Sequence, residues 1–439
     1  MNKRIVVLGA GISGLGAAIL AKRKGFDVFV SDKGKITEDN KKALLNNDID
    51  WEEGRHSLEN ITNAHEIIKS PGIADQTDLV QTLNSYNIPV ISEVEFAFRY
   101  TRAQIAAITG TNGKTTTTLL LGHILRNAGY EVLVAGNVGV GFAYSIAERD
   151  YDYIVLELSS FQLDGIKKFR SDVSIILNIT PDHLDRYDNN IENYADAKFN
   201  ITRNQNINDF LIYNADDVVV QKVETRARKM PISLINEQRE GGYLYNNELI
   251  IKINNKTMTI QELALQGKHN VFNSMAAAMA ARVFEVKDTV IRQSMLDFQS
   301  VEHRLEYVLT VHGIDFINDS KATNINACWF ALESMKKDVV WIAGGVDKGN
   351  DYSPLDKMVK DKVKAIICLG ENNKNIIKSF QGKVDTIVQA SSMSEAVTQS
   401  FSLAHKGESV LLSPACASFD LFSNYEDRGF QFKQAVRAL

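Results

Sequence analysis

The stretch that decides the fold is QIAAITGTNGKTT, residues 104–116. It begins as an apolar, strand-like run and continues into two glycines, a pattern typical of a phosphate-binding turn before a helix, which we expect to begin near Thr116. Backbone amides and the Lys114 ammonium can hold the β- and γ-phosphates of a nucleotide, and the Thr115 hydroxyl can bind Mg²⁺. The loop is shorter than the usual G-x-x-x-x-G-K-[ST] pattern, because Ile108 stands where that pattern has its first glycine. The alternative interpretation is that Gly113-Lys114-Thr115 occurs by chance at the start of a helix and binds no phosphate.

A second glycine-rich loop lies near the start of the chain. Ile5-Val6-Val7-Leu8 is an apolar run suited to a buried parallel strand, and Gly9-x-Gly11-x-x-Gly14 follows it and opens a helix. Asp32 ends the next strand-like run, where folds of this kind bind a ribose hydroxyl. The pattern indicates the diphosphate of a nucleotide. NAD or FAD, another nucleotide diphosphate and a purely structural glycine turn all remain open.

Strand-like and helical runs alternate along all 439 residues, which predicts an α/β fold with parallel sheets covered by helices. The length suits about three domains, and we place them at 1–99, 100–301 and 302–439. Residues 243–261 suggest small antiparallel strands, and 270–282 an alanine- and methionine-rich helix. The other expected strands cover 28–32, 66–70, 89–91, 153–158, 173–177, 210–213, 338–343, 365–369 and 409–412.

The composition is that of an ordinary globular protein, with 44% hydrophobic and 23% charged residues. The net charge of −5 gives no global reason to bind nucleic acid or an anionic membrane. We find neither a targeting peptide nor an apolar run long enough to span a membrane. Three cysteines argue against a disulfide framework and favour a reducing, cytoplasmic location.

Two polar residues near strand ends are candidates for metal binding. Glu157 ends the apolar run that starts at Tyr153, and a carboxylate there is costly unless a cation faces it. His183 follows another strand, and a neutral imidazole suits a divalent ion. The alternatives are that Glu157 is a structural carboxylate satisfied by hydrogen bonds and that His183 lies in a loop or caps a helix. The sequence pattern around Lys198 by itself predicts a solvent-exposed lysine on a helix.

Three polar loops follow strand-like runs in the last third of the chain, and parallel sheets bind ligands at such strand ends. Lys321 and Lys348, which lie in two of these loops, suggest an acidic ligand. Cys416 is a poor candidate for a nucleophile, since no histidine or basic cluster lies near it in sequence. The loops cover residues 318–324, 344–349 and 413–420.

The two glycine loops together separate the function classes. A flavin or NAD oxidoreductase needs the first loop and leaves GTNGKTT unexplained. A regulatory nucleotide-binding protein leaves Glu157, His183 and the 318–324 loop unexplained. An enzyme that uses ATP on a nucleotide-tagged substrate needs both loops.

Four motifs make the chain resemble the Mur ligase family: GTNGKTT (110–116), ELSSFQL (157–163), NDSKATN (318–324) and LSPACASFD (412–420). The resemblance implies three domains: a Rossmann-like N-terminal domain that binds UDP, a central P-loop mononucleotide-binding α/β domain that binds ATP, and a Rossmann-like C-terminal domain that contacts the amino acid. The last three motifs are most similar to the members that add D-glutamate to UDP-N-acetylmuramoyl-L-alanine through an acyl phosphate, for peptidoglycan synthesis. Another Mur-family ligase or a folylpolyglutamate-type ligase is the alternative. We expect a monomer.

The resemblance also implies roles for individual residues. Thr115, Glu157, His183 and a carbamylated Lys198 would bind Mg²⁺, and Lys114 would act on the transferred phosphate. ATP contacts would come from Gly110, Thr111, Asn112, Gly113, Lys114, Thr115, Thr116, Asn270, Arg304 and Asp319. Contacts to the UDP-sugar would come from Ser13, Gly14, Leu15, Asp32, Asn137 and Gln162, and contacts to D-glutamate from Thr323, Lys348, Ser418 and Tyr425.

Overall fold

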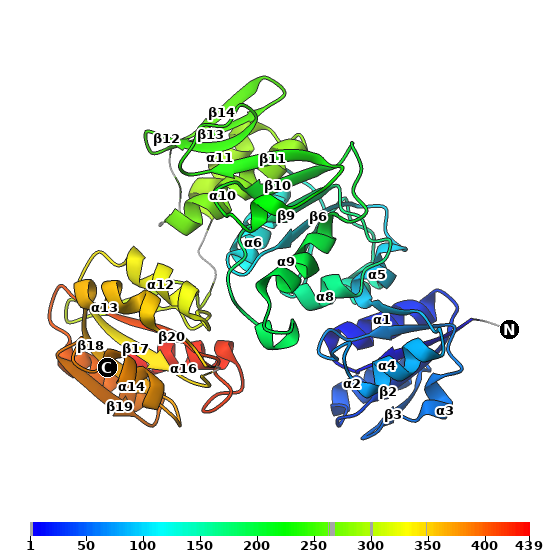
Figure 1. Ribbon diagram of the computed structural model, residues 1–439, viewed down its shortest axis with the longest axis horizontal. Helices are drawn as coiled ribbons and strands as arrows, with labels where there is room; N and C mark the ends of the chain where they lie inside the picture. The colour runs from blue at the N-terminus through cyan, green and yellow to red at the C-terminus, as the bar shows by residue number, and fades with distance from the viewer. Residues whose placement is uncertain (1–2, 262, 264–267, 299–301, 348) are drawn as a thin grey trace. The chain divides into compact units, whose positions relative to one another are not determined.

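The computed structural model describes residues 3–261, 263, 268–298, 302–347 and 349–439 (Figure 1). The chain forms two compact units, the first comprising residues 1–263 and 270–298 and the second 264–269 and 299–439. The first unit contains two sheets and the second unit one. The expected α/β architecture is therefore confirmed. The boundary expected near 99 lies within the first unit and stays a prediction, and residue 301 lies outside the described residues.

The first sheet has five parallel strands in the order β3-β2-β1-β4-β5, the strand order of a Rossmann-like half. Val6, Val7 and Leu8 in its central strand have no exposed surface, as a strand covered on both faces requires. The strands are β1 (Arg4–Leu8), β2 (Asp27–Asp32), β3 (Asp50–Glu53), β4 (Glu66–Lys69) and β5 (Val90–Ser92). The helices are α1 (Ile12–Arg23), α2 (Glu38–Asn46), α3 (Leu58–Ile61), α4 (Asp78–Ser85) and α5 (Glu93–Phe98).

The second sheet has nine strands in the order β14-β13-β12-β11-β10-β9-β6-β8-β7. Its parallel part comprises β6 (Gln104–Thr109), β7 (Val132–Gly136), β8 (Tyr153–Glu157), β9 (Val173–Ile176), β10 (Phe210–Asn214), β11 (Arg228–Ser233) and β12 (Gly241–Tyr245). Antiparallel β13 (Glu248–Ile253) and β14 (Lys256–Ile260) extend it. Both hairpins turn through asparagine pairs with positive φ, at 246–247 and 254–255, as tight hairpin turns require.

The helices that accompany this sheet connect its strands or follow its last hairpin. They are α6 (Lys114–Asn127), α7 (Phe142–Glu148), α8 (Ser160–Asp164), α9 (Ile191–Phe199), α10 (Lys268–Val283) and α11 (Asp288–Asp297). Helix α6 begins at Lys114, two residues before the expected start at Thr116, because Gly113 already serves as its N-cap. The expected antiparallel strands and the helix at 270–282 are confirmed.

Two buried glutamates of α5 link the two sheets of the first unit. Glu95 is fully buried, and its Oε2 accepts hydrogen bonds from the backbone N–H groups of 167, 168 and 169 at 2.8–2.9 Å. Glu93 accepts one from the Ala143 N–H at 2.6 Å, at the start of α7. Burial raises the pKa of Glu93 to about 7. The segment around residue 99 is thus tied to the second sheet by side chains as well as by the chain itself.

The second unit contains a six-stranded sheet in the order β15-β16-β20-β17-β18-β19, of which only β15 is antiparallel to its neighbour. The strands are β15 (Glu306–Val311), β16 (Ile314–Asn318), β17 (Val339–Gly344), β18 (Val363–Leu369), β19 (Thr386–Ala390) and β20 (Ser409–Ala415). The helices are α12 (Ile325–Ser334), α13 (Asp356–Lys362), α14 (Lys374–Phe380), α15 (Met393–Leu403) and α16 (Tyr425–Arg437). No helix in the described part of the chain combines the length and apolar character that crossing a membrane requires.

Candidate active site

The phosphate loop between β6 and α6 is held open by one asparagine. Asn178 accepts hydrogen bonds from the Thr111 N–H through its backbone oxygen and from the Asn112 N–H through Oδ1, both at 2.8 Å. Its Nδ2 donates to the Asn112 carbonyl at 2.9 Å. The loop is therefore fixed by a residue that follows the neighbouring strand β9 by two positions.

Lys114 reaches back across the same loop. Its Nζ donates to the carbonyl oxygens of Gly110 and Thr111 at 2.8 and 2.9 Å. The ammonium thus lies within the loop, next to the backbone that a phosphate would approach. Thr115 and Thr116, the next residues, are buried in the first turn of α6.

Gly113 is required by its conformation and by its neighbour. Its φ of +86° is left-handed, and a Cβ there would lie 2.3 Å from Oδ1 of Asn273 on α10. Asn273 in turn donates to Oδ1 of Asn270 at 3.4 Å. The helix predicted to supply an ATP contact through Asn270 therefore meets the phosphate loop directly.

Lys198 is buried on α9, with 1% of its surface exposed. Its Nζ donates to the Gly110 carbonyl at 3.1 Å and lies 4.3 Å from the centre of the Tyr194 ring. Burial, reinforced by the nearby charge of Lys114, lowers the pKa of Lys198 well below its usual value. The structure therefore buries the Lys198 amine beside the phosphate loop, where the sequence pattern alone suggested a solvated side chain.

Glu157 ends β8, which pairs with β6 just before the phosphate loop. It is 2% exposed; its Oε1 accepts from Asn137 Nδ2 at 2.8 Å, and its Oε2 has no hydrogen-bond partner in the described part of the chain. A buried carboxylate oxygen without a partner is unfavourable. Oxygen ligands of this kind suit Mg²⁺. Glu157 and the Thr115 hydroxyl therefore fit a hard divalent cation.

His183 lies on the loop that follows β9. Its φ is +52° and its ring packs edge-on against Phe161, with centroids 5.3 Å apart. The neighbouring Asp182 carries a charge that acts on Lys198, and Thr180 bonds Thr111 of the phosphate loop. His183 therefore follows a segment that contacts the phosphate loop, and its role as a metal ligand stays a prediction. Within the described ranges, no three His, Cys, Asp or Glu side chains form a ready metal-binding group.

The conformation of the N-terminal glycine loop is fixed by close backbone packing between Gly14 and Gly9 and by hydrogen bonds to Asp32. A Cβ on Gly14 would lie 1.8 Å from the Gly9 carbonyl oxygen. Asp32 accepts hydrogen bonds from the N–H groups of Ala10 and Gly34, at 2.6 and 2.7 Å. The carboxylate predicted to bind a ribose hydroxyl therefore also shapes the loop. Half-buried Ser13 and Leu15 lie in the first turn of α1.

The loop between β7 and α7 comes close to this N-terminal loop. A Cβ on Gly141 would lie 3.3 Å from Cγ2 of Ile12, the residue before Ser13. Asn137, which holds Glu157, begins this β7–α7 loop. The UDP-sugar contact predicted at Asn137 therefore lies between the two glycine loops.

Gln162 occupies a structural position in α8. Its Oε1 accepts from the N–H and hydroxyl of Ser159, and its own N–H donates to the Ser159 hydroxyl, which forms a capping box. Ser-x-x-Gln is a recognisable capping pattern, so this local role could have been found in the sequence.

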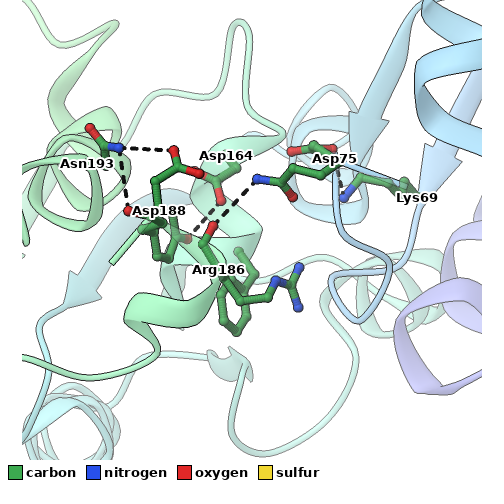
Figure 2. A pocket seen from close by; sticks show the side chains of 9 residues that line it. Lys69, Asp75, Asp164, Arg186, Asp188 and Asn193 are labelled. Carbon is green, nitrogen blue, oxygen red and sulfur yellow. Dashed lines mark hydrogen bonds and ion pairs between the residues drawn. The ribbon is translucent and has the colours of Figure 1, made fainter. Parts of the chain in front are cut away.

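A polar pocket of about 280 Å³ lies between the end of β4 with the loop after it and the segments that carry Asp164 and Arg186 (Figure 2). Lys69 Nζ pairs with Asp75 at 3.1 Å, and the Tyr187 hydroxyl donates to Asp164 at 2.8 Å. The Arg186 guanidinium lies 4.1 Å from the centre of the Phe161 ring. The lining residues are Lys69, Asp75, Gln76, Phe161, Asp164, Arg186, Tyr187, Asp188 and Asn193.

In the second unit, Arg304 and Asp319 lie together. Asp319 is buried, and burial raises its pKa to about 7, against the opposing charge of Arg304. It accepts from the Leu305 N–H at 3.1 Å and from the Ser413 hydroxyl at 2.9 Å. Both predicted ATP contacts of this unit are therefore neighbours.

Two of the expected D-glutamate contacts, Thr323 and Ser418, lie on the loops that follow the adjacent strands β16 and β20. Arg428 is buried and ties these loops together, because it donates to the carbonyls of Ser320 and Cys416 at 2.8 and 3.2 Å. Ser418 is buried, Thr323 is exposed and Tyr425 starts α16. Lys348, predicted as a fourth contact, lies outside the described residues.

Cys416 has the environment of a structural thiol. It is buried beside the Tyr352 hydroxyl at 3.3 Å, and burial raises its pKa to about 11. A thiol with a raised pKa is a poor nucleophile.

The structure adds supporting residues that the sequence did not single out. Asn178 binds the phosphate loop, Asn273 packs closely against Gly113, and Asp182 and Tyr194 lie beside Lys198. Asn178 and Asn273 are far in sequence from the phosphate loop, so no local pattern indicated them. Tyr194 lies one helical turn before Lys198 on α9, a spacing that could have indicated the contact.

Three family models match successive parts of the chain. They are the Mur ligase MurD-like N-terminal domain at residues 3–92, the Mur ligase middle domain at 108–281 and the Mur ligase glutamate ligase domain at 303–416. The first and third matched ranges cover the first and third sheets, and the second range covers the second sheet except for the first residues of β6. The three-domain organisation is thereby supported independently of the contacts.

Full-length relatives lead to the same family. A protein of Christiangramia forsetii named UDP-N-acetylmuramoylalanine--D-glutamate ligase is 51% identical, with 100% of both chains covered. A protein of Bacteroides fragilis with the same name is 49% identical, again over 100% of both chains. The fold also resembles the crystal structure of MurF ligase from Thermotoga maritima in complex with ADP, with a TM-score of 0.62, 15% identity and coverage of 96% of this chain and 99% of that one. The chain therefore belongs to the Mur ligase family.

Proposed function

We propose that this chain is an ATP-dependent ligase that joins D-glutamate to UDP-N-acetylmuramoyl-L-alanine, giving ADP and phosphate, in the synthesis of peptidoglycan precursors. One observation carries the chemistry: a phosphate loop is flanked by a buried lysine and by a buried carboxylate with an unpartnered oxygen. An enzyme that brings two anions together needs such a site. The names of the full-length relatives support the substrates.

The reaction has two steps. The L-alanyl carboxylate oxygen attacks the γ-phosphorus of ATP, the bond to the β-γ bridging oxygen breaks, and ADP leaves. The amine of D-glutamate then attacks the acyl-phosphate carbon, loses a proton, and phosphate leaves as the amide forms. Phosphorylation is needed because oxide is a poor leaving group. Lys114 stabilises the negative charge that develops on the transferred phosphoryl group.

Residues of the first unit would hold Mg²⁺, which supplies positive charge to the phosphates. Thr115, Glu157 and His183 are its proposed ligands. Asn137 orients Glu157 by binding one carboxylate oxygen and leaves the other for the ion.

Lys198 is proposed to be carbamylated. Carbamylation requires a neutral amine, which attacks CO₂ and releases one proton, and the lowered pKa of Lys198 supplies that amine. The resulting carbamate is an anion on a buried side chain near the metal ligands. It would turn a repulsive contact with Lys114 into an attractive one.

The remaining predicted contacts complete the proposed binding sites. Asn270, Arg304 and Asp319 would contact ATP, along with the phosphate loop at 110–116. Ser13, Gly14, Leu15, Asp32, Asn137 and Gln162 would contact the UDP-sugar. Thr323, Ser418 and Tyr425 would contact D-glutamate.

We also propose that the protein acts in the cytoplasm as a monomer. ATP is available there, and all three cysteines are free and buried, as suits a reducing compartment. Light scattering of the purified protein at two concentrations tests the oligomeric state.

The decisive experiment is phosphate release with UDP-N-acetylmuramoyl-L-alanine and a panel of amino acids. Release should require ATP, the UDP-sugar and D-glutamate together, with L-glutamate and D-lysine at background. Preference for another amino acid would indicate a different Mur-family ligase. Activity with a folate and L-glutamate would indicate a folylpolyglutamate-type enzyme, and release without any acceptor would contradict ligation.

A further inference from the structure

The short loop that presents Arg304 has an unusual backbone. His303 and Leu305, the residues on either side, have φ values of +62° and +44°. The left-handed region is costly for side chains with a Cβ, and such conformations persist only where the surroundings impose them. The Nε of Arg304 is buried and has no hydrogen-bond partner among the residues described. A strained loop thus presents a guanidinium whose Nε is unsatisfied.

The contacts that impose this backbone converge on His303 and Leu305. The His303 N–H donates to Oε2 of Glu306 at 2.8 Å, and its carbonyl accepts from the Lys321 N–H at 3.1 Å. The Leu305 N–H donates to Asp319 at 3.1 Å. The backbone on both sides of Arg304 is therefore fixed by partners outside the loop.

The ring of His303 is fixed as well. The Ser320 N–H donates to Oδ1 of Asn318 at 3.2 Å, which identifies Nδ2 of Asn318 as the atom facing His303 Nδ1 at 2.9 Å. Nδ1 must therefore accept, and the imidazole is neutral. A Cβ on Gly429 of α16 would lie 2.2 Å from the same Nδ1, so the helix backbone packs directly on the ring.

Lys433 lies one turn further along α16 and completes the arrangement. Its Nζ contacts Glu302 and donates to Oε1 of Glu306 at 3.1 Å, and its side chain is only 10% exposed. Glu306 thus gives one oxygen to Lys433 and the other to the His303 N–H and Asn318. Without Lys433, the Glu306 carboxylate would be a partly buried anion without its cation, held in place only by the His303 N–H and Asn318.

We propose that Lys433 is a positioning residue for ATP, which acts through Glu306 to keep the 303–305 backbone in the conformation that presents Arg304 to a phosphate. The inference rests on the proposed function in one respect, namely that Arg304 meets ATP. Lys433 itself contacts none of the residues assigned to substrates, and it lies outside all four family motifs.

The experiment compares Lys433→Met, Lys433→Arg and Glu306→Gln with a matched control. Lys364→Met is that control, because Lys364 forms a similar pair with Glu408 at 3.2 Å in the same unit, near the start of β18. Steady-state kinetics give the KM for ATP and for D-glutamate, and calorimetric titration with ADP and Mg²⁺ gives a dissociation constant that needs no turnover. Thermal unfolding monitors stability.

Lys433→Met should raise the KM for ATP and the ADP dissociation constant about five- to tenfold, with kcat and the D-glutamate KM within about twofold. Glu306→Gln should do the same, Lys433→Arg should restore most of the affinity, and Lys364→Met should match the wild type. In an Arg304→Ala background, Lys433→Met should add nothing, because its effect passes through Arg304.

The proposal is overturned by unchanged nucleotide affinity in Lys433→Met, by an equal effect of Lys364→Met, or by full additivity with Arg304→Ala. If Lys433→Met does not fold, the same measurements on Glu306→Gln, alone and combined with Arg304→Ala, test the proposal. A wild-type protein that binds ADP but makes no product would instead contradict the proposed function, and the ADP measurements would still judge Lys433.

Discussion

The Nζ of Lys198 lies 3.1 Å from the carbonyl oxygen of Gly110, the first residue of the phosphate loop. The lysine is buried on α9, so this contact joins that helix to the turn between β6 and α6. Burial and the nearby charge of Lys114 both lower the pKa of Lys198, which favours the neutral amine that the proposed carbamylation requires.

Lys198→Ala should lose nearly all ligation, and short carboxylates such as acetate should restore part of it by occupying the vacated space. Depletion of CO₂ should slow the wild-type enzyme, and bicarbonate should reactivate it. Phosphate release measures both effects. Lys222→Met, which removes an exposed lysine of the same unit, is the control and should be unaffected. Normal activity of Lys198→Ala, or indifference of the wild type to CO₂, would contradict the carbamate.

Lys114→Met should lower kcat by about a thousandfold or more, because a preorganised charge on the transferred phosphoryl group is lost. Binding of the UDP-sugar, measured by calorimetry, should stay within about twofold, since that ligand is assigned to the N-terminal glycine loop. A variant that kept a tenth of the wild-type rate would rule out the phosphate-loop role of Lys114.

Glu157→Gln should raise the stability of the protein and lower its ligation activity. The variant replaces a buried anionic oxygen that has no partner by a neutral amide, so the melting temperature without Mg²⁺ should rise by a few degrees. Ligation should fall about a hundredfold, and the Mg²⁺ concentration for half-maximal rate should increase. Unchanged Mg²⁺ dependence would show that Glu157 does not bind the ion.

Gly113→Ala should weaken ATP binding at least about tenfold, since the left-handed conformation costs about 1–2 kcal/mol and the added Cβ collides with Asn273. Gly129→Ala separates the two causes. Gly129 has a φ of +91° with open space around its Cβ position, so its variant should lose stability without losing nucleotide affinity. If the Gly113→Ala and Gly129→Ala variants bound nucleotide with equal affinity, the Asn273 contact would not account for the effect of the Gly113 substitution.

Glu93→Gln should flatten the pH dependence of stability. Burial raises the pKa of Glu93 from 4.5 to about 7, so between these values the native state holds a proton that the unfolded chain releases. The free energy of unfolding should therefore fall by about 3 kcal/mol as pH rises through this window. Asp319, with a pKa also raised to about 7, adds a second contribution, so Glu93→Gln should reduce the slope without abolishing it.

Urea titrations of both proteins at pH 5 and pH 8 measure this difference. Glu131→Gln, an exposed change in the same unit, should leave the slope as it is. A slope as steep in Glu93→Gln as in the wild type would mean that this carboxyl does not gain a proton on folding.

Apolar runs and glycine spacing were enough to predict most of the parallel strands and both nucleotide-type loops. The strand-like run expected at the start of residues 104–116 is strand β6, Gln104–Thr109, because a strand buried on both faces is a continuous apolar run. Strands such as β3, with the sequence DWEE, were not predicted, since their stability comes from pairing rather than from composition. Edge pairing is a tertiary property that a single sequence does not display.

The chemistry of the site was less accessible to sequence than its location. The position of Lys198 next to Gly110 depends on how α9 packs, and the same residue pattern also describes an exposed helix. Asn178 lies 66 residues after its partner Asn112, and Asn273 lies 160 residues after Gly113, against which it packs. Only the resemblance to a family could assign Lys198 a role before the structure.

The three hydrogen bonds that Glu95 accepts from residues 167–169 affect how the protein can be divided in the laboratory. A fragment that ends at residue 99 would expose an apolar helix whose two glutamates have lost their donors. The complementary fragment would contain three backbone N–H groups without their acceptor. A fragment of residues 1–298 keeps these contacts together with both sheets of the first unit, so biophysical work on the proposed UDP-binding region should begin from that length.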